Sequence, residues 1–420
     1  MKLNEIVVKH KSVLTGAICC VAFILIAIAN SAAEEPDCSM VAKAINITSK
    51  LRGLHVRRKV PCRLENREQV EKYIRAKILE DATERKIINE GIAFRALGLI
   101  PASFNYLNGL VKMYVSQLGG YYDAKLDYYV MAEWIPAPMQ MSIAIHELTH
   151  ALQDQHYNLD SLMDEIDEPS DLLMAKAALI EGDATAVMLD YSRKISGQQM
   201  LQEDKSVSGF MMQSLLGSMF SSATHGAPPS LQAMLMFPYV SGLNFAHTLL
   251  TSRNNKGYQN IDRAYKSLPI STEQILHPDK YLAGKSDFVE LEDQLPSDTT
   301  RIKSTKPIYS DRLGEFAIAT LLSNWLPPAR ASTSATGWGG DRISVYEHID
   351  AKSYVVTWAT NWDTVSDSEG FFQAIVDAYS KRFSITPRND FDKTAYFDTP
   401  EIGVVRIMRD DTKVLLEIGL

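Results

Sequence analysis

The sequence contains few cysteines, no internal repeat and no low-complexity stretch. Only 4 of its 420 residues are cysteine, and positive charge is also scarce, since 43 Lys and Arg stand against 51 Asp and Glu. The resulting net charge of −8 argues against a nucleic-acid-binding protein. Hydrophobic residues make up 46% of the chain and charged residues 22%, so the chain can bury a large core and its composition shows no sign of disorder.

Long apolar runs are absent except near the N-terminus. The run from Ala17 to Ala29 is shorter than the ~20 residues that a membrane-spanning helix needs. It follows a basic start and precedes three small residues; these flanks are Lys2, Lys9 and Lys11, and Ser31-Ala32-Ala33. This order predicts a signal peptide over residues 1–33, whose cleavage leaves a secreted or periplasmic protein. An uncleaved N-terminal membrane anchor is the alternative.

Cleavage would change both the charge and the cysteine content. Residues 1–33 hold three lysines and one glutamate, so the mature chain would carry −8 − 2 = −10. Cys19 and Cys20 would leave with this segment, and Cys38 and Cys62 would remain. In an oxidising compartment these two are expected to form a disulfide that closes a short loop.

The order of helical and strand-like patterns predicts an α+β fold. Helical spacing of apolar residues occurs over 66–95 (one helix or two), 139–156, 171–194, 200–219, 230–251, 312–325 and 369–383. A strand or hairpin is expected over 121–135, and strands over 343–348, 354–360, 403–409 and 413–418. Turns are expected at the glycine-rich residues 337–340 and at Asp410-Asp411. We divide the chain into an N-terminal helical region (34–118), a mostly helical core (119–300) and a C-terminal α+β region (301–420).

The run His146-Glu147-Leu148-Thr149-His150 lies in the predicted helix 139–156. Positions i and i+4 of a helix lie on the same face, so both histidines can reach one metal ion. Glu147 is rotated by about 100° from His146, given 3.6 residues per turn, which places its carboxylate beside the ion. There it can take the proton of a water that zinc has made more acidic, as that water attacks a carbonyl. We therefore predict a zinc site with Glu147 as the general base.

Glu181 is the candidate for a third zinc ligand. It follows His150 by 181 − 150 = 31 residues and lies on the predicted helix 171–194. Its neighbours on that helix face are small and give a carboxylate no solvation: Ala177, Ala178, Ala184 and Thr185. A glutamate buried there is costly unless a cation compensates its charge. The alternatives are a surface glutamate and two histidines whose hydrogen bonds are satisfied within the core.

The residues around this site resemble a known family. The stretch Ile145–His156, followed by Glu181-Gly182-Asp183-Ala184, is similar to the gluzincin metallopeptidases, and in particular to predicted secreted bacterial members. Three further segments carry the resemblance: Phe237-Pro238-Tyr239, Ser271–Pro278 and Gly337–Arg342. It covers roughly residues 120–365. It implies a zincin-like core in which an edge strand beside the active-site helix holds a peptide by backbone pairing, with His146, His150 and Glu181 as zinc ligands and Glu147 as base.

The sequence departs from this family at one position. Better-known gluzincins often carry an aspartate four residues after the glutamate ligand, where it braces the first histidine. Here that position is Thr185, and the nearby aspartate is Asp183. The residue that braces a ligand through a hydrogen bond is therefore left open among Asp183, Asp154 and Thr185.

Hydrolysis also needs a hydrogen-bond donor for the developing oxyanion. His277, which precedes Pro278, is the first candidate, and Tyr281 and Tyr239 follow. The alternative role for His277 is to cap a helix end. Arg342 can bind a substrate carboxylate, but a structural salt bridge is the favoured interpretation. His156 is expected to be a helix-end histidine.

Two other functions compete with a peptidase that acts on peptides or proteins. One is a zinc-stabilised, non-catalytic binding or chaperone module of the cell envelope, which has no use for Glu147 and usually closes its fourth metal position with protein. The other is a metal-dependent hydrolase of a different bond. In addition, Cys62 within Pro61-Cys62-Arg63 resembles an inhibitory cysteine that plugs a zinc site, as an alternative to the disulfide.

Overall fold

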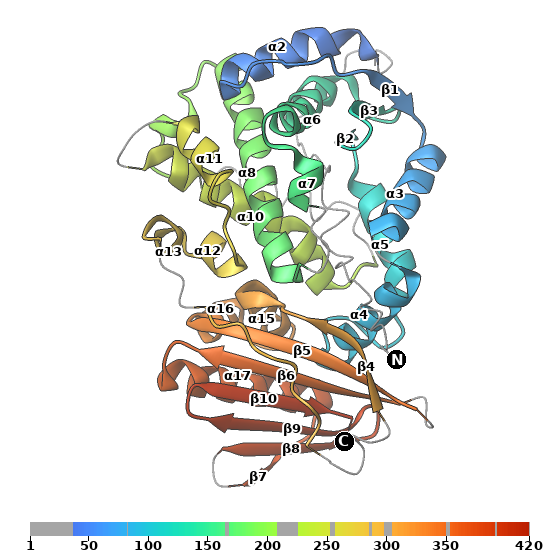
Figure 1. Cartoon of the computed structure of the whole chain (residues 1–420), viewed down its shortest axis with the longest axis vertical. Helices are drawn as coiled ribbons and strands as arrows, with labels where there is room; N and C mark the ends of the chain where they lie inside the picture. Colours follow the sequence, from blue (N-terminus) through green and yellow to red (C-terminus); the bar gives the residue numbers. More distant parts are fainter. Residues whose placement is uncertain are drawn as a thin grey trace, which may run out of the picture.

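A computed structural model describes residues 37–81, 83–163, 168–207, 226–252, 257–284, 288–297, 305–349, 353–390 and 393–419. The predicted signal peptide and most of the predicted helix 200–219 lie outside these ranges. Figure 1 shows a helical part with a small sheet, packed on a second part that is built around a larger sheet. The fold therefore belongs to the predicted α+β class. None of the helices in the described ranges has both the length and the hydrophobicity to cross a membrane.

The described chain begins with a 3-10 helix, η1 (Cys38–Met40), and with α2 (Val41–Arg52). Cys38 and Cys62 form the predicted disulfide, so Cys62 is not a free inhibitory cysteine. The predicted span 66–95 holds two helices, α3 (Arg67–Asp81) and α4 (Glu84–Leu97), and α5 (Tyr106–Gln117) follows. The break between α3 and α4 is marked by Thr83, whose side chain accepts a hydrogen bond from the Lys86 N–H and caps α4.

A three-stranded sheet with the order β1-β3-β2 lies beside α6 (Ala137–Tyr157). β1 (Cys62–Glu65) runs parallel to β3 (Tyr128–Ala132), and β2 (Gly120–Asp123) is antiparallel to β3. The segment 121–135 is thus a hairpin, and its edge strand β2 contacts α6. Because β1 belongs to the same sheet, elements on both sides of the boundary predicted at residue 118 pack together.

Two long helices, α8 (Ser170–Ile195) and α10 (Pro229–Thr251), and several short ones make up the rest of the helical part in the described ranges. After α6 come α7 (Leu159–Met163), α8, η2 (Leu201–Glu203), α10, α11 (Tyr258–Ala264), α12 (Thr272–Leu276) and α13 (Pro278–Leu282). The predicted helices 139–156, 171–194 and 230–251 correspond to α6, α8 and α10. Their agreement follows from the long, regular apolar periodicity of these segments.

α8 and α10 approach each other closely because glycines lie at their contact. A Cβ atom at Gly182 would lie 2.1 Å from the carbonyl oxygen of Gly242, and a Cβ atom at Gly242 would lie 2.2 Å from the carbonyl oxygen of Ala178. Backbone atoms cannot yield at such distances without moving a whole helix. The two glycines therefore set the spacing of the helices beside Glu181.

Gly242→Ala is expected to destabilise the protein by roughly 1–3 kcal/mol, because its methyl group would push α10 away from the backbone of α8. Gly370→Ala is the matched control, since Gly370 lies in the helix α17 (Val365–Phe383) with no atom within 4 Å of the added Cβ. That control should gain up to about 1 kcal/mol. Urea unfolding of both variants measures the difference. If Gly242→Ala unfolds at the wild-type urea concentration, the close approach is not needed for stability.

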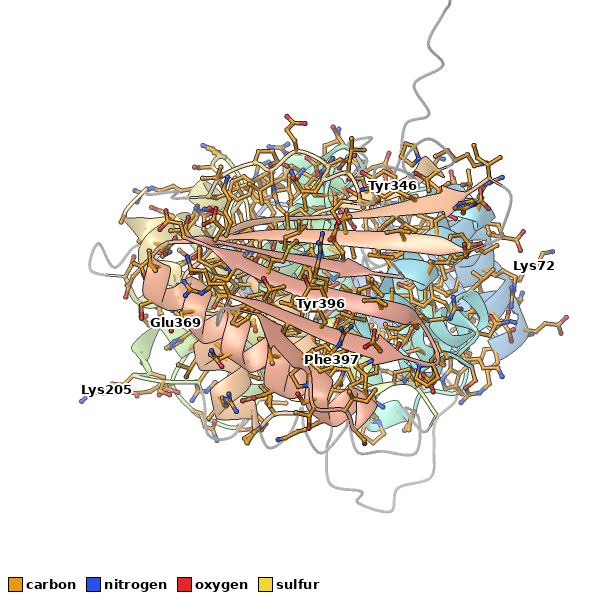
Figure 2. All side chains as sticks on the ribbon, turned by 90° about the horizontal axis from the view of Figure 1, so that it is seen from below. Lys72, Lys205, Tyr346, Glu369, Tyr396 and Phe397 are labelled. Carbon is orange, nitrogen blue, oxygen red and sulfur yellow. A yellow bond between two sulfur atoms is a disulfide. The ribbon has the colours of Figure 1, made fainter. Side chains whose placement is uncertain are left out.

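The C-terminal part is a seven-stranded antiparallel sheet with the order β4-β5-β6-β10-β9-β8-β7. Its strands are β4 (Thr305–Asp311), β5 (Trp338–His348), β6 (Tyr354–Trp362), β7 (Arg388–Asp390), β8 (Thr394–Thr399), β9 (Gly403–Asp410) and β10 (Lys413–Ile418). The helices α15 (Gly314–Ser323) and α17 pack against it, and α16 (Pro328–Ala335) packs against these two helices. Figure 2 shows this sheet from below, with Tyr346 on β5 and Tyr396 on β8.

Two predicted turns are displaced. β5 begins at Trp338, inside the stretch 337–340 that was expected to be a turn, and Gly340 lies at a register shift of this strand with a φ of 138°. Glycine permits that backbone geometry without ending the strand. The last hairpin turns at Asp411-Thr412 and not at Asp410-Asp411, because Asp410 pairs with Lys413. Four strands were not predicted, namely β1, β4, β7 and β8, which are short or irregular in their alternation.

Candidate metal centre

The helix α6 carries both predicted histidine ligands. It begins after Pro136, the last residue of the connection from β3. It ends before Asn158, whose backbone is in the left-handed conformation. His146 and His150 lie one turn apart on its buried face, each with 1% exposure. Their Nε2 atoms are 3.1 Å apart, so both imidazoles point to the same place.

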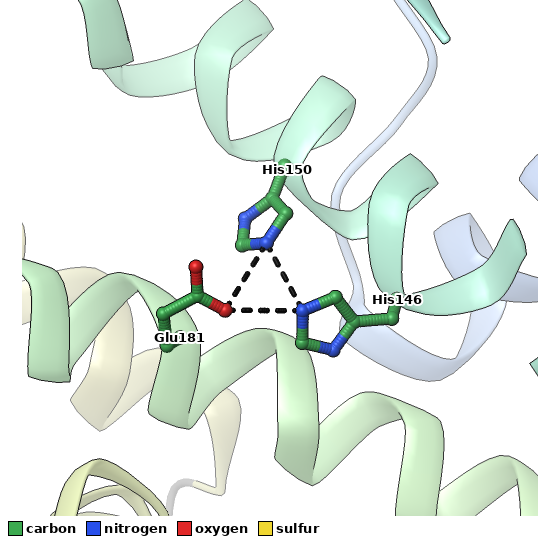
Figure 3. Close-up of side chains that lie close together, drawn as sticks. All are labelled: His146, His150 and Glu181. Atoms are coloured by element: carbon green, nitrogen blue, oxygen red, sulfur yellow. Dashed lines mark hydrogen bonds and ion pairs between the residues drawn. The ribbon is translucent and has the colours of Figure 1, made fainter. Parts of the chain in front are cut away.

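Glu181 reaches this place from α8. Its Oε2 atom lies 3.0 Å from His146 Nε2 and 3.4 Å from His150 Nε2, and its exposure is 1% (Figure 3). The three predicted ligands therefore meet, although Glu181 is distant in sequence. Together they form a buried group that can hold a metal ion.

The separations of these atoms fit a tetrahedral metal site. Donor atoms that bind zinc at roughly 2.0–2.1 Å in a tetrahedron lie about 3.3 Å from each other. The three observed separations of 3.0, 3.1 and 3.4 Å are close to this value. Two imidazole nitrogens and a carboxylate oxygen at these distances must share protons or a cation, because their lone pairs would otherwise repel one another. Among the described residues the group contains three such ligands, the number of protein ligands that a catalytic zinc site has when water or substrate takes its fourth position.

Glu147 lies next to these ligands and is fully buried. Its Oε2 atom accepts a hydrogen bond of 3.1 Å from the backbone N–H of Tyr122 on the edge strand β2. Its Oε1 atom has no hydrogen-bond partner in the described part of the chain. Burial raises the pKa of the Glu147 carboxyl to about 8, an effect that His150 partly offsets. A buried oxygen without a partner and a pKa near neutrality are both properties of a group that exchanges protons.

The ligands also influence the charge of one another. Burial disfavours both charged forms, but the carboxylate of Glu181 raises the pKa of His150 to about 9, and His150 lowers the pKa of Glu181 to about 2. Burial lowers the pKa of His146. In the metal-free protein a proton on His150 therefore compensates Glu181, and a bound metal ion would displace that proton.

A residue that was not among the candidates braces one metal ligand, His150, whereas His146 Nδ1 has no hydrogen-bond partner in the described part of the chain. The side-chain oxygen of Gln153 lies 2.8 Å from His150 Nδ1, and the Gln153 amide nitrogen donates to Asp183 Oδ2 at 2.8 Å. Asp183 is therefore connected to His150 only through Gln153. Asp154 instead binds Arg58 and Tyr122, and the hydroxyl of Thr185 has no hydrogen-bond partner within the described ranges. The only sequence signal for Gln153 is its position three residues after His150, on the same helix face.

The three candidate oxyanion donors have different surroundings. His277 Nε2 lies 2.9 Å from Glu315 Oε1, a contact that raises the pKa of His277. The Tyr281 hydroxyl donates to the Ser267 carbonyl at 2.7 Å. The ring of Tyr239, which follows the internal Pro238 of α10, is stacked on His146 with a centroid distance of 6.2 Å. Tyr239 is therefore the candidate that the structure brings into contact with a ligand.

The segment Gly337–Arg342 has a structural role in this fold. The buried carboxylate of Asp341 accepts four hydrogen bonds of 2.8–3.1 Å, from the N–H groups of Leu313 and Gly314 and from the indoles of Trp338 and Trp358. It thereby joins the start of α15 to β5 and β6. Arg342 pairs with Asp293 at 2.8 Å, as the salt-bridge interpretation predicts. His156 lies at the end of α6, with Nε2 2.9 Å from the His55 carbonyl.

Comparisons with known proteins concern only the C-terminal part. Residues 302–419 match a family model that is described as a domain of unknown function (DUF8575). The matched range holds the seven-stranded sheet and none of the metal-centre residues. No curated protein matches the chain. No solved structure matches it either.

Proposed function

We propose that this protein is a zinc metallopeptidase of the gluzincin type that acts outside the cytoplasm. His146, His150 and Glu181 would hold the zinc ion, and Glu147 would be the general base. One observation carries the proposal: three buried ligand atoms meet at 3.0–3.4 Å, and the residue beside them is a buried glutamate with one unpaired oxygen. The disulfide between Cys38 and Cys62 supports an oxidising compartment.

The ligand set favours zinc over other metals. Imidazole nitrogens suit zinc, copper, iron and nickel, whereas calcium and magnesium prefer sites made of oxygen atoms. Two histidines and one glutamate are the ligands of a recurrent class of catalytic zinc sites. A bound zinc ion would supply Lewis-acid chemistry, because it polarises a carbonyl and makes water more acidic.

The protein's own groups explain how the proton moves. The N–H of Tyr122 holds Glu147 Oε2, so Oε1 is the oxygen left to take the proton of the attacking water. Once protonated, Glu147 can deliver this proton to the leaving amine. Of the candidate oxyanion donors, Tyr239 has its ring against the ligand His146, whereas His277 is engaged with Glu315.

One observation favours the alternative, a zinc-stabilised binding or chaperone module of the cell envelope. The three ligands and Glu147 are at most 1% exposed, whereas a peptide must reach the ion to be cleaved. Against this alternative, a structural site usually has four protein ligands, and three meet here within the described residues. The catalytic function therefore requires that the protein opens above the ligands when a substrate binds.

A peptide library tests this function directly. The mature protein, loaded with one equivalent of Zn²⁺, is incubated with peptides of diverse sequence, and the products are identified by mass spectrometry. We expect cleavage that disappears on treatment with a chelator and returns when Zn²⁺ is added. A protein that binds Zn²⁺ tightly and leaves every peptide intact would support the non-catalytic module instead.

A further inference from the structure

Arg52, the last residue of α2, is buried beneath the metal centre. Its side chain has 0% exposure, although arginine is almost never fully buried unless it is paired. Its Nε donates to Asp183 Oδ1 at 2.7 Å, and its NH1 lies 2.7 Å from Asp262 Oδ1. The guanidinium also lies over the ring of Tyr258, 5.1 Å from its centroid. Burial alone would lower the pKa of Arg52, but the two carboxylates raise it, so the group stays cationic.

Asp183 connects Arg52 to a metal ligand. Its Oδ1 accepts from Arg52, while its Oδ2 accepts from the Gln153 amide at 2.8 Å and from the Tyr265 hydroxyl at 3.2 Å. All three of these groups are donors to Asp183. The salt bridge with Arg52 compensates the carboxylate in a buried place where a lone one would be costly.

This arrangement determines how the Gln153 amide is turned. Its nitrogen faces two acceptors, Asp183 Oδ2 at 2.8 Å and the Ile180 carbonyl at 3.1 Å. Its oxygen therefore faces His150 Nδ1 at 2.8 Å, and this nitrogen must be the donor. When His150 donates from Nδ1, its Nε2 lone pair points to the metal position, as ligation requires.

We propose that Arg52 is a positioning residue for the metal centre, acting on His150 through Asp183 and Gln153. This inference rests on the proposed function, since it concerns the same metal ion. α2 lies within the loop that the disulfide between Cys38 and Cys62 closes. Through Arg52, residues before the predicted core would therefore contribute to the metal site of that core. Arg52 contacts neither a ligand nor the substrate, and its effect passes through two residues and three hydrogen bonds.

Arg52→Met is expected to weaken Zn²⁺ binding by up to about 10–100-fold, the cost of losing the direct hydrogen-bond partner of a metal ligand, because Arg52 acts on that partner. The affinity of the full mature chain is measured by competition with a chromophoric chelator. Gln153→Met removes the acceptor for His150 Nδ1. Its loss of Zn²⁺ affinity is the largest that the hydrogen-bond chain Arg52–Asp183–Gln153–His150, here called the relay, can cause. Arg52→Lys keeps the charge and should recover part of the affinity. Arg58→Met is the control, because it removes another Arg–Asp pair, that with Asp154 of α6, which does not lead to a ligand; the side chain of Arg58 is 47% exposed and that of Arg52 0%.

A spectroscopic signature separates positioning from general destabilisation. In Zn²⁺-loaded protein labelled with ¹⁵N-histidine, the hydrogen-bonded Nδ1–H of His150 should give a protected, downfield proton signal. That signal should be lost in Gln153→Met, should exchange faster in Arg52→Met and should persist in Arg58→Met. A variant that only loses stability would keep the signal until it unfolds.

The outcomes distinguish the relay from the function on which it rests. Wild-type protein that binds no Zn²⁺ would overturn both. Wild-type affinity and an unchanged Nδ1–H signal in Arg52→Met would overturn the relay and leave the metal site intact. If Arg52→Met does not fold because Asp183 becomes an uncompensated buried charge, the double variant Arg52→Met/Asp183→Asn removes both charges. Undiminished Zn²⁺ affinity in that double variant would equally reject Arg52 as a positioning residue.

Discussion

Replacing Glu147 by glutamine is expected to lower kcat/KM by about 10²–10⁴-fold while the protein keeps its metal and its fold. Glutamine has the shape of glutamate, and its side-chain oxygen can still accept the hydrogen bond from the Tyr122 N–H. The three ligands are untouched, so Zn²⁺ content should stay at one per chain. What is lost is the oxygen that takes a proton from the attacking water, because an amide does not accept that proton near neutral pH.

The pH dependence of stability gives this variant a second readout. In the metal-free protein, burial raises the pKa of Glu147 from 4.5 to about 8. A carboxyl whose pKa is higher in the folded state contributes stability below its unfolded pKa, and that contribution is lost as the pH rises through the folded pKa. Glutamine does not titrate. Relative to the wild type, metal-free Glu147→Gln should therefore become more stable as the pH rises from about 4.5 to about 8, as thermal unfolding can measure.

Glu133→Gln is the control for this experiment, since Glu133 is an exposed glutamate on the connection between β3 and α6. It should keep wild-type kcat/KM on any peptide that the enzyme cleaves. Normal turnover by Glu147→Gln, with zinc retained, would show that catalysis does not occur at this metal site. The non-catalytic module would then be the better explanation of the buried ligands.

The metal ligands could be predicted because a short and regular sequence spacing defines the metal-binding motif. His146 and His150 are one helical turn apart, and the apolar periodicity of α6 and α8 is strong enough to place all three ligands on helices. Glu181 required one further argument, namely that a carboxylate among small residues needs a cation. The same regularity explains why the long helices of the core were found with bounds within a few residues of those observed.

The surroundings of the ligands could not be predicted because they depend on contacts between distant segments. Arg52 and Asp183 are 131 residues apart, and no periodic pattern connects α2 to α8. The parallel pairing of β1 with β3 could not be predicted for the same reason. β1 has only four residues, and it is stable as a strand only when it pairs with β3. The brace on His150 was sought among acidic and hydroxyl side chains, whereas the structure uses the amide of Gln153, whose orientation only its neighbours can define.

Removing the Glu181 carboxylate should abolish the response of the protein to zinc. Wild-type protein at a free Zn²⁺ concentration of 1,000 Kd should gain about 4 kcal/mol of unfolding free energy, since only the folded state holds the ligands together. Glu181→Ala should gain almost none at the same concentration, because two imidazoles remain and the negative charge that favours the cation is gone. The loss of affinity should exceed the 10–100-fold that outer-sphere changes cause. Elemental analysis and thermal unfolding with and without Zn²⁺ measure both effects.

Two further variants show which property of Glu181 matters. Glu181→Gln keeps the packing between α6 and α8 but removes the charge, so it should bind Zn²⁺ more weakly than the wild type and more tightly than Glu181→Ala. Glu203→Ala, at an exposed glutamate in η2, should respond to zinc as the wild type does. The metal-free Glu181→Ala protein should also lose the main partner that raises the pKa of His150, so this pKa should fall. If Glu181→Ala still takes up one zinc ion with wild-type affinity and shows the full thermal shift, the third ligand lies elsewhere and the assignment of this glutamate is wrong.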